Sequence, residues 1–579
     1  MSRKHFSFAA AFAAFALMTG AQAFAAYTPG TYDAVAAGRN GDVTLHVTFD
    51  ENAITDITAE HEETDGIGST AIEELGKAAV ESQMIPTDAV AGATVSSEAF
   101  MNALKDAVTQ AGGDAGAMEG SVEEVQDAPA GYVTEADVIV VGGGAAGMTA
   151  AVTASENGAS VILLEKSGSL GGNTLAAANG VNAADSKIQL EDAQYQEAQA
   201  GVDGLENLQM QNELARENLV DAFAENSGEV IDWLTDMGVE FTVDIQQDDR
   251  NPVQNYYMLR ADAMGSTGIT MTKTVQSAME NSDVQYYLNV DATELILDEN
   301  GAVTGVKAVD ASGTEQSFTG KAVLIATGGF GHNQELLGEV NPKLANAVTD
   351  EIAPTTGEGL LMAQAAGAKA VDLEWIQTFP VVMEGYGMVT PNKLPGGFGV
   401  NAVIVNNEAQ RFAAEGFEIG DAILEQPEGA AYMIFREDQI SEPMQNIINA
   451  GYVASADTAE ELGEALGLDG STLQATVDAY NEDVADGTDD AFGKGDPLPL
   501  EGTLYGFKYG VGAHYFMGGI LINEKTQVLD ENEEPIEGLY AAGEVTGGFH
   551  GSQRIDGSGI GDSFTFGRIA GKEMAQAVR

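Results

Sequence analysis

The sequence predicts an α/β protein in which a small α+β domain precedes a larger Rossmann-like nucleotide-binding domain, itself interrupted by an α+β capping domain. Three observations support this prediction. The chain has 579 residues, too many for one hydrophobic core. Residues 42–49 alternate apolar and polar side chains, as a half-buried strand does. An apolar run ending at Val141 leads directly into Gly142-Gly-Gly-Ala-Ala-Gly147, the pattern of a dinucleotide-binding turn.

The composition excludes several kinds of function. The 90 acidic and 25 basic residues give a formal charge of −65, which repels nucleic acid and anionic membranes. We therefore expect no nucleic-acid partner, and a general solubility bias explains the charge better than a specific partner does. The chain contains no cysteine, which excludes disulfides, iron–sulfur ligation and C-x-x-C-H haem attachment. We expect no metal site.

The first 26 residues have the pattern of a secretory signal peptide. Arg3 and Lys4 supply the positive start, an apolar run follows to about Met18, and small residues at 21–26 offer cleavage sites. The apolar run is too short for a comfortable membrane span. We therefore expect residues 1–26 to be removed and the protein to be exported to the periplasm or the cell surface.

Residues 27–112 form the first expected domain. Period-two strands at 42–49 and 53–57 precede a helix rich in Ala and Glu, and a second helix is expected from about 97 to 110. Residues 113–133 are rich in Gly, Ala and acidic side chains, which is typical of a linker.

The second domain opens with a βαβ unit around the glycine turn. Gly142 permits the tight turn, Gly144 lets the backbone approach a pyrophosphate, and Gly147 allows the helix to pack closely on the strand. The positive end of that helix faces the phosphates. Glu165 ends the next strand, where an acidic side chain hydrogen-bonds a ribose. We predict nucleotide contacts at these residues and at Ala146.

The remaining boundaries follow from changes of pattern. Residues 134–369 form the first part of the nucleotide-binding domain, and the apolar run at 322–329 is expected to be another strand of its sheet. Residues 370–495 mix strand and helix patterns without a nucleotide fingerprint, so we interpret them as the capping domain. Residues 496–579 return to the nucleotide-binding domain and end in a helix.

Several short motifs resemble those of one flavoprotein family. Gly171-Gly-Asn-Thr174, Thr327-Gly-Gly-Phe330 and the block from Gly538 to Gly567 resemble the flavin subunit of FAD-dependent fumarate and urocanate reductases, of the flavocytochrome c type. The resemblance covers nearly all of residues 27–579. It implies non-covalently bound FAD, with these further cofactor contacts: Gly172, Asn173, Thr174, Gly328, Gly543, Glu544, Gly559 and Ile560.

A second flavin is implied by the segment Asp88-Ala-Val-Ala-Gly-Ala-Thr94. It resembles the D-x-x-[ST]-G-A-T signature of domains that carry FMN covalently on the final threonine, which here is Thr94. Ala91 departs from the signature, because Ser or Thr is usual there. The resemblance implies an exported FMN transferase as a partner. Taken alone, the segment is also compatible with a loop that precedes a helix capped by Ser96 or Ser97.

Two candidate catalytic residues come from the same resemblance. His514 matches the family histidine that helps to bind a substrate carboxylate, and Arg554 matches the arginine that binds a carboxylate beside the flavin. A guanidinium pairs with a carboxylate through two parallel hydrogen bonds. The alternative for His514 is a hydrogen-bonded histidine of the core.

The departures from the family concern the other end of the substrate. Phe379-Pro380 stands where fumarate reductases have a carboxylate-binding His before Pro, and Thr390-Pro391 stands where they have a Thr-Glu pair. Ile419 occupies the position of their proton-donating Arg. Phe379 and Thr390 are therefore the predicted substrate-binding residues at this end. A pocket lined by Phe379 favours an apolar or aromatic group and rejects a second carboxylate.

The proton donor has no clear candidate in the sequence. Tyr515 is included among the predicted catalytic residues, and Tyr386, Lys393 and Glu415 are further candidates. For each tyrosine the alternative is ordinary packing with a solvated hydroxyl.

The expected activity is therefore reduction of the C=C bond of an α,β-unsaturated carboxylate, urocanate- or cinnamate-like more than fumarate, in anaerobic respiration. Electrons would pass from a membrane-linked donor of the quinol oxidase or cytochrome type to FMN, then to FAD, then to the substrate. One alternative is an FAD-dependent dehydrogenase that introduces a double bond next to a carbonyl, as in 3-ketosteroids. Another is a flavin electron carrier without catalysis.

Overall fold

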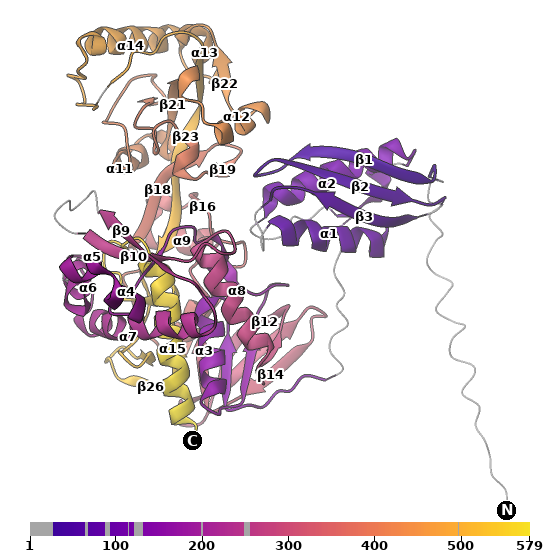
Figure 1. Ribbon diagram of the computed structural model, residues 1–579, viewed down its shortest axis with the longest axis vertical. Coiled ribbons are helices and arrows are strands. Elements are labelled where there is room, and N and C mark those ends of the chain that lie inside the picture. Colours follow the sequence, from indigo (N-terminus) through magenta and orange to yellow (C-terminus); the bar gives the residue numbers. More distant parts are fainter. Residues whose placement is uncertain are drawn as a thin grey trace, which may run out of the picture. The chain divides into compact units, whose positions relative to one another are not determined.

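The computed structural model describes residues 27–51, 53–63, 68–86, 93–113, 115–120, 131–198, 201–247, 255–495 and 497–579. The expected signal peptide and the loop 87–92, which contains most of the FMN signature, lie outside these residues. The described chain forms two compact units, and residues 115–120 of the expected linker belong to the first of them (Figure 1).

The first unit packs two helices against a three-stranded antiparallel sheet of order β1-β2-β3. The alternation predicted for residues 42–49 is confirmed, because every second side chain of β2 is buried. The second helix begins at Thr94, three residues earlier than expected, and buries Phe100 and Leu104. The elements are β1 (Gly30–Ala37), β2 (Asp42–Phe49), β3 (Ile54–Glu60), α1 (Gly68–Ser82), β4 (Ile85–Pro86), α2 (Thr94–Gln110), η1 (Ala115–Met118) and β5 (Glu119–Gly120).

The second unit is built on a six-stranded sheet of order β11-β7-β6-β15-β26-β25. All neighbours in it are parallel except β25 and β26. The strands β6 and β7 are fully buried on both faces, as the apolar runs predicted. This confirms the predicted α/β fold. The strands are β6 (Val138–Val141), β7 (Val161–Leu164), β11 (Gln285–Tyr287), β15 (Ala322–Ile325), β25 (Gln527–Leu529) and β26 (Pro535–Ala541).

Two helices far apart in sequence lie together beside this sheet, α3 (Ala145–Glu156) and the C-terminal α15 (Ser558–Ala577) (Figure 1). Glycines allow the close approach. A Cβ on Gly567 would lie 2.6 Å from the carbonyl oxygen of Ala146, and one on Gly571 would lie 2.6 Å from that of Ala150. The end of the chain is thereby fixed beside the glycine turn.

Smaller elements surround the central sheet. Two three-stranded sheets, β8-β10-β9 and β12-β13-β14, and a set of helices complete this part of the unit. Their bounds are η2 (Gly172–Ala176), β8 (Val181–Asn182), α4 (Lys187–Glu191), α5 (Ala193–Ala198), α6 (Val202–Gln209), α7 (Glu217–Asp236), β9 (Thr242–Gln247), β10 (Asn255–Arg260), α8 (Thr267–Glu280), β12 (Val290–Leu297), β13 (Val303–Asp310), β14 (Glu315–Thr319), α9 (Gln334–Val340), η3 (Pro342–Leu344) and α10 (Glu358–Ala365).

The expected capping segment forms a separate sheet of order β19-β18-β23-β21-β20, with β16 and β22 also paired to β23. The central strand β23 comes from residues beyond 495, so the sheet joins the expected capping segment to the C-terminal part. In Figure 1 helices α12–α14 gather around β22 and β23. The elements are β16 (Val348–Thr349), β18 (Ile376–Met383), β19 (Gly387–Met388), η4 (Pro391–Lys393), β20 (Val403–Val405), α11 (Ile419–Leu424), η5 (Pro427–Gly429), β21 (Ala430–Arg436), η6 (Glu437–Gln439), α12 (Glu442–Asn449), β22 (Ala454–Ala456), α13 (Ala459–Ala465), α14 (Gly470–Asp483), η7 (Val484–Asp486) and β23 (Leu504–Phe516).

Another small sheet has the order β17-β24-β27. Its strands are β17 (Ala370–Val371), β24 (Gly519–Leu521) and β27 (Thr546–Gly547). Within the described ranges, no helix is both long enough and apolar enough to cross a membrane.

Candidate active site

The glycine turn leaves the N-terminus of α3 open. Gly144 is the N-cap of α3, and neither a capping side chain nor an acidic residue in the first turn satisfies the free backbone N–H groups. A Cβ on Gly144 would meet no atom within 4 Å, so an atom group can approach the backbone there. By contrast, a Cβ on Gly147 would lie 1.9 Å from the carbonyl oxygen of Gly142. Gly147 therefore serves packing, and Gly144 serves the ligand side of the turn.

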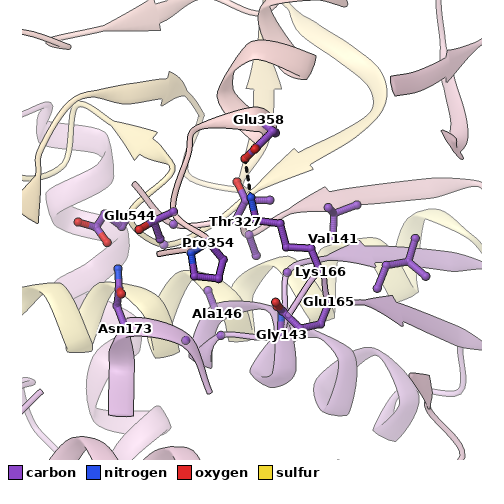
Figure 2. A pocket seen from close by; sticks show the side chains of 18 of the residues that line it. Val141, Gly143, Ala146, Glu165, Lys166, Asn173, Thr327, Pro354, Glu358 and Glu544 are labelled. Atoms are coloured by element: carbon purple, nitrogen blue, oxygen red, sulfur yellow. Dashed lines mark hydrogen bonds and ion pairs between the residues drawn. The ribbon is translucent and has the colours of Figure 1, made fainter. Parts of the chain in front are cut away.

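A cavity opens in front of this turn, with about 820 Å³ of empty space that includes open solvent. Figure 2 shows Glu165 and Lys166 on one side of it, and Asn173 and Glu544 on the other. Ten of the predicted cofactor-binding residues line the cavity: Gly142, Gly144, Ala146, Glu165, Gly172, Asn173, Thr174, Gly328, Gly543 and Glu544.

The cavity fits a dinucleotide such as FAD. The carboxylate of Glu165 accepts hydrogen bonds from the backbone N–H of Gly143 at 2.6 Å and from that of Ser167 at 2.7 Å, which fixes it where a ribose hydroxyl is expected. Thr327 also lines the cavity, and its buried hydroxyl has no hydrogen-bond partner among the described atoms.

Two further predicted cofactor residues, Gly559 and Ile560, lie at the start of α15 and do not line the cavity. A Cβ on Gly559 would lie 2.8 Å from the ring of Tyr515 and 3.2 Å from the side chain of Arg554. Gly559 therefore permits the close contact between α15 and the residues predicted to bind substrate.

Arg554 and His514 lie together, as the resemblance implied. The Nη2 group of Arg554 lies 3.2 Å from Nε2 of His514, and its Nε donates to Oε1 of Gln377 at 2.9 Å. Arg554 is only 8% exposed. Among the described residues, its ion-pair partner is Asp556 at 3.8 Å, which is a long contact. A buried guanidinium with so distant a counter-charge is suited to an anionic ligand.

A β-bulge aims His514 at Arg554. Gln377 pairs with Tyr515 while Thr378 pairs with Ala513, so His514 has no partner across the ladder between β18 and β23. A bulge of this kind redirects a side chain. Because an Arg can only donate, Nε2 of His514 must accept, and Nδ1 then donates to Oδ2 of Asp350 at 2.8 Å.

The ring of Tyr515 packs against the guanidinium of Arg554. The guanidinium carbon of Arg554 lies 4.8 Å from the centre of the Tyr515 ring. The Tyr515 hydroxyl donates to Oδ2 of Asp562 at 3.2 Å and lies 3.1 Å from Nε2 of His550. Burial, with the nearby charge of Asp562, raises the pKa of Tyr515 well above its usual value, and burial lowers the pKa of His550. Tyr515 therefore keeps its proton, which makes it a poor proton donor.

Aromatic side chains continue the site beyond His514. The ring of Phe379 stacks on the imidazole of His514 with 4.5 Å between centroids. Phe379 also contacts Phe398 at 6.0 Å and Phe417 at 5.7 Å, and these two rings contact each other at 5.2 Å. All three phenylalanines are partly exposed. We call them the aromatic cluster.

The other sequence candidates lie elsewhere. Thr390 is exposed and its hydroxyl donates to Asn392 at 2.6 Å, with no contact to Arg554 or His514 in the described chain. Glu415 is enclosed by Arg411 at 2.9 Å and Lys494 at 3.4 Å, in a buried ion cluster of the capping sheet. That arrangement is structural, because both carboxylate oxygens bind Arg411.

In the first unit, Thr94 is the first residue of α2, so the predicted attachment point lies at a helix N-terminus. Most of its signature, residues 87–92, falls outside the described residues. The buried carboxylate of Glu63 accepts hydrogen bonds from the Ser96 hydroxyl at 2.5 Å and from the backbone N–H of Asn40 at 3.0 Å. These bonds fix the loop segments around the start of α2. FMN attachment to Thr94 stays a prediction.

Several site residues had no motif to announce them. Gln377 precedes Phe379 by two residues on β18. Because residues two apart on a strand point to the same face, this spacing could have indicated that Gln377 lies beside Phe379. Asp350, Phe398 and Phe417 reach the site only through the chain's long-range folding, which no local pattern in the sequence shows.

Comparison with known protein families agrees with the two flavin sites. An FAD binding domain model matches residues 137–560, and an FMN-binding domain model matches residues 38–109. The chain belongs to the FAD-dependent fumarate and urocanate reductase family with an N-terminal FMN-binding domain. This family consists of flavin reductases of unsaturated carboxylates, and the chain is an FAD-dependent oxidoreductase acting on CH–CH bonds.

Individual relatives cover most of the chain. Urocanate reductase of Eggerthella lenta is 33% identical, over 93% of this chain and 91% of the relative. NADH:fumarate oxidoreductase of Klebsiella pneumoniae is 30% identical over 96% of this chain, which spans 59% of that relative. An open conformation of a flavocytochrome c3 fumarate reductase is structurally similar, with a TM-score of 0.69 and 32% identity over 78% of this chain and 79% of that one.

Proposed function

We propose that this protein reduces the C=C bond of an α,β-unsaturated monocarboxylate that carries an aryl group, resembling urocanate or cinnamate more than fumarate. The observation that carries this proposal is the position of Arg554 against the aromatic cluster. Arg554 is a buried guanidinium whose nearest ion-pair partner lies at 3.8 Å, and it contacts His514. The imidazole of His514 stacks on Phe379, which belongs to the partly exposed aromatic cluster. A ligand with one carboxylate and one aromatic ring matches both groups.

Each residue of the site has its own role in the proposed reaction. Arg554 binds the substrate carboxylate, with Gln377 holding its Nε and the Tyr515 ring supporting its plane. His514, oriented by Asp350, accepts a hydrogen bond from Arg554 and so holds the guanidinium in place. The donors of Arg554 stabilise negative charge that develops on the carboxylate as the double bond is reduced.

Bound FAD would supply a hydride, which is two electrons and one proton, to the β-carbon, and a second proton would be added at the α-carbon. The glycine turn, Glu165, Asn173 and Glu544 would hold the cofactor. Phe379, Phe398 and Phe417 would receive the aryl ring and exclude water from it. A second carboxylate buried among these rings would have no partner, which disfavours fumarate.

We further propose the route of the electrons. FMN carried covalently by Thr94 through an exported flavin transferase would receive electrons from a membrane-linked donor and pass them to FAD. The FMN-binding domain match supports the presence of this flavin. The signal-like pattern of residues 1–26 supports export to the periplasm or cell surface, where anaerobic respiration would use the reductase.

A reoxidation assay tests the proposed reaction. Purified protein, reduced anaerobically by a low-potential dye, is mixed with urocanate, cinnamate, acrylate and fumarate, and flavin absorbance is followed. We expect the aryl acids to reoxidise the flavin fastest. A protein that no enoate reoxidises, but that a saturated ketone reduces, would instead be a dehydrogenase, and the proposal would be wrong.

A further inference from the structure

Glu351 is a hydrogen-bonding neighbour of Glu544, which lines the FAD cavity. Oε2 of Glu351 accepts from the backbone N–H of Gly331 at 2.7 Å, and Oε1 accepts from Nδ2 of Asn173 at 3.0 Å. Oε1 of Glu544 accepts from the backbone N–H of Phe516 at 3.1 Å. Glu351 is only 7% exposed, and Glu544 lines the cavity. In the part of the chain that the structure describes, no Lys or Arg forms an ion pair with either carboxyl.

The other titratable groups around the pair supply little positive charge. Asp350 adds negative charge next to Glu351, and the Tyr515 phenol near Glu544 is neutral. His514 is the neighbouring group that lowers the pKa of Glu544 through its charge, but its Nδ1 is already bonded to Asp350. His332 contacts the backbone carbonyl of Glu351 rather than its carboxyl.

Two adjacent buried carboxyls cannot both ionise at low cost. Burial, reinforced by the charge of Glu544, raises the pKa of Glu351 well above its usual value. Burial also raises the pKa of Glu544. One proton on the pair avoids this cost and leaves a single carboxylate charged. The remaining carboxylate is a site where a second proton can bind.

The pair lies at the end of the cavity that adjoins the substrate-binding residues. Figure 2 shows Glu544 and Asn173 across the cavity from Glu165, the residue expected at the ribose. Phe516, whose N–H binds Glu544, follows His514 by two residues on β23. A charge that develops at this end is therefore close to the pair.

We propose that Glu351 and Glu544 form a proton-binding pair that takes up one further proton from solvent when electrons enter the FAD cavity. Glu544 touches the cofactor site, and Glu351 acts through Glu544 as a positioning residue. This inference depends on FAD occupying the cavity and not on the identity of the substrate.

The charge balance gives the reason. Two electrons delivered to a flavin together with one proton add one negative charge to the cavity. In a low-dielectric site this charge repels the remaining carboxylate of the pair strongly. One proton bound by that carboxylate leaves both glutamates neutral and cancels the added charge. In total, two electrons and two protons enter the site.

Potentiometric titration of the bound FAD tests the proton count. Full-length protein carrying Thr94→Val, with its flavin content verified as FAD alone, is titrated over the neutral pH range. Each proton taken up per two electrons changes the midpoint potential by about 30 mV per pH unit. We expect a slope of about 59 mV per pH unit, for two protons, rather than about 30 mV, for one. If protein with both glutamates unchanged shows a slope of one proton per two electrons, the proposal is wrong.

Variants then assign the second proton. Glu544→Gln should lower the slope to one proton per two electrons, because Glu351 already holds its proton. Glu351→Gln resembles the protonated Glu351 and should keep the two-proton slope. Glu358→Gln is the matched control, because Glu358 lines the same cavity but pairs with Lys166 at 2.9 Å. Although burial raises it, hydrogen bonds from Thr356 and Lys166 lower the pKa of Glu358 overall, so it stays ionised. Its variant should keep the two-proton slope.

Infrared difference spectra provide a second measurement. Reduction of the wild-type protein should produce the carbonyl stretch of a newly protonated carboxylic acid, which shifts in D₂O and is absent from Glu544→Gln. Absence of this band in the wild type, or its survival in Glu544→Gln, would contradict the pair. Substrate is not present in either measurement, so failure here leaves the proposed reductase activity standing, and failure of the enoate assay leaves this result standing.

Discussion

The guanidinium of Arg554 lies over the ring of Tyr515, 4.8 Å from its centre, while the Tyr515 hydroxyl is bonded to Asp562 and His550. The aromatic face fixes the guanidinium plane, and the hydroxyl network fixes the ring. The guanidinium that we propose as the carboxylate-binding group is thus positioned by the Tyr515 ring. This arrangement favours support of Arg554 over proton transfer as the role of Tyr515.

Arg554→Lys should abolish most activity even though the charge is kept. A lysine has no planar fork and cannot stack on Tyr515 while binding Gln377 and a carboxylate. Loss of a buried charged partner costs about 2–5 kcal/mol, so kcat/KM should fall by roughly 30-fold or more. Steady-state reoxidation kinetics measure the loss of activity, and FAD absorbance shows whether the variant still binds the cofactor. Full activity with bound FAD would remove Arg554 from carboxylate binding.

Asp350→Asn should weaken substrate binding more than turnover. Asp350 is 40% exposed, so its bond to Nδ1 of His514 is screened by solvent. Such pairs contribute about 1 kcal/mol or less, which predicts a rise in KM of up to about fivefold. Asp350→Glu is the conservative comparison and should recover part of the loss. A fall in kcat with unchanged KM would show that Asp350 acts in a chemical step instead.

Arg411→Ala should destabilise the capping sheet without changing substrate preference. Arg411 binds Glu415 at 2.9 Å and Asp489 at 2.7 Å, with both carboxylates fully buried. Removing one partner of such a cluster costs about 3–5 kcal/mol. Chemical denaturation monitored by tryptophan and flavin signals measures the loss. If Glu415 were the proton donor, Glu415→Gln would instead abolish turnover while stability stayed unchanged.

The same cluster predicts a loss of stability in acid. The hydrogen bonds from Arg411 hold the pKa of Asp489 well below its usual range in the folded protein. A carboxyl with a lowered folded pKa stabilises the protein above its unfolded pKa, about 3.9, and loses this contribution as the pH falls toward the folded value. The difference in denaturation midpoint between wild type and Asp489→Asn should therefore shrink below about pH 4. A difference that stays constant in acid would contradict this role.

Local patterns in the sequence predicted the nucleotide-binding part well, because a glycine turn between buried strands is a contiguous signal. The strands β6 and β7, the helix α3 and four cavity-lining residues, Gly142, Gly144, Ala146 and Glu165, were predicted from such runs, whereas the other six came from the family resemblance. The substrate end was predicted only in part. The β-bulge that aims His514 and the approach of Asp350 depend on strand register and long-range packing, which single motifs do not encode.

Thr94→Val should prevent covalent attachment of FMN. The hydroxyl of Thr94 is the predicted ester oxygen, and valine keeps the side-chain shape while removing that oxygen. Intact mass of protein produced with a flavin transferase should show the added FMN mass in wild type and not in the variant. A Thr94→Val protein that still carries covalent FMN would refute this attachment point.

Phe417→Leu should reduce the preference for aryl acids over alkyl acids. Phe417 contacts Phe379 at 5.7 Å and Phe398 at 5.2 Å, so the variant removes one wall of the aromatic cluster. An aromatic pair contributes about 0.5–1.5 kcal/mol beyond its buried area, which predicts a two- to tenfold fall in the ratio of kcat/KM for cinnamate to that for acrylate. Phe492→Leu is the matched control, because Phe492 contacts Arg411 in the ion cluster and not the aromatic cluster. That control should leave the ratio unchanged. An unchanged ratio in Phe417→Leu would mean that the substrate tail binds away from these rings.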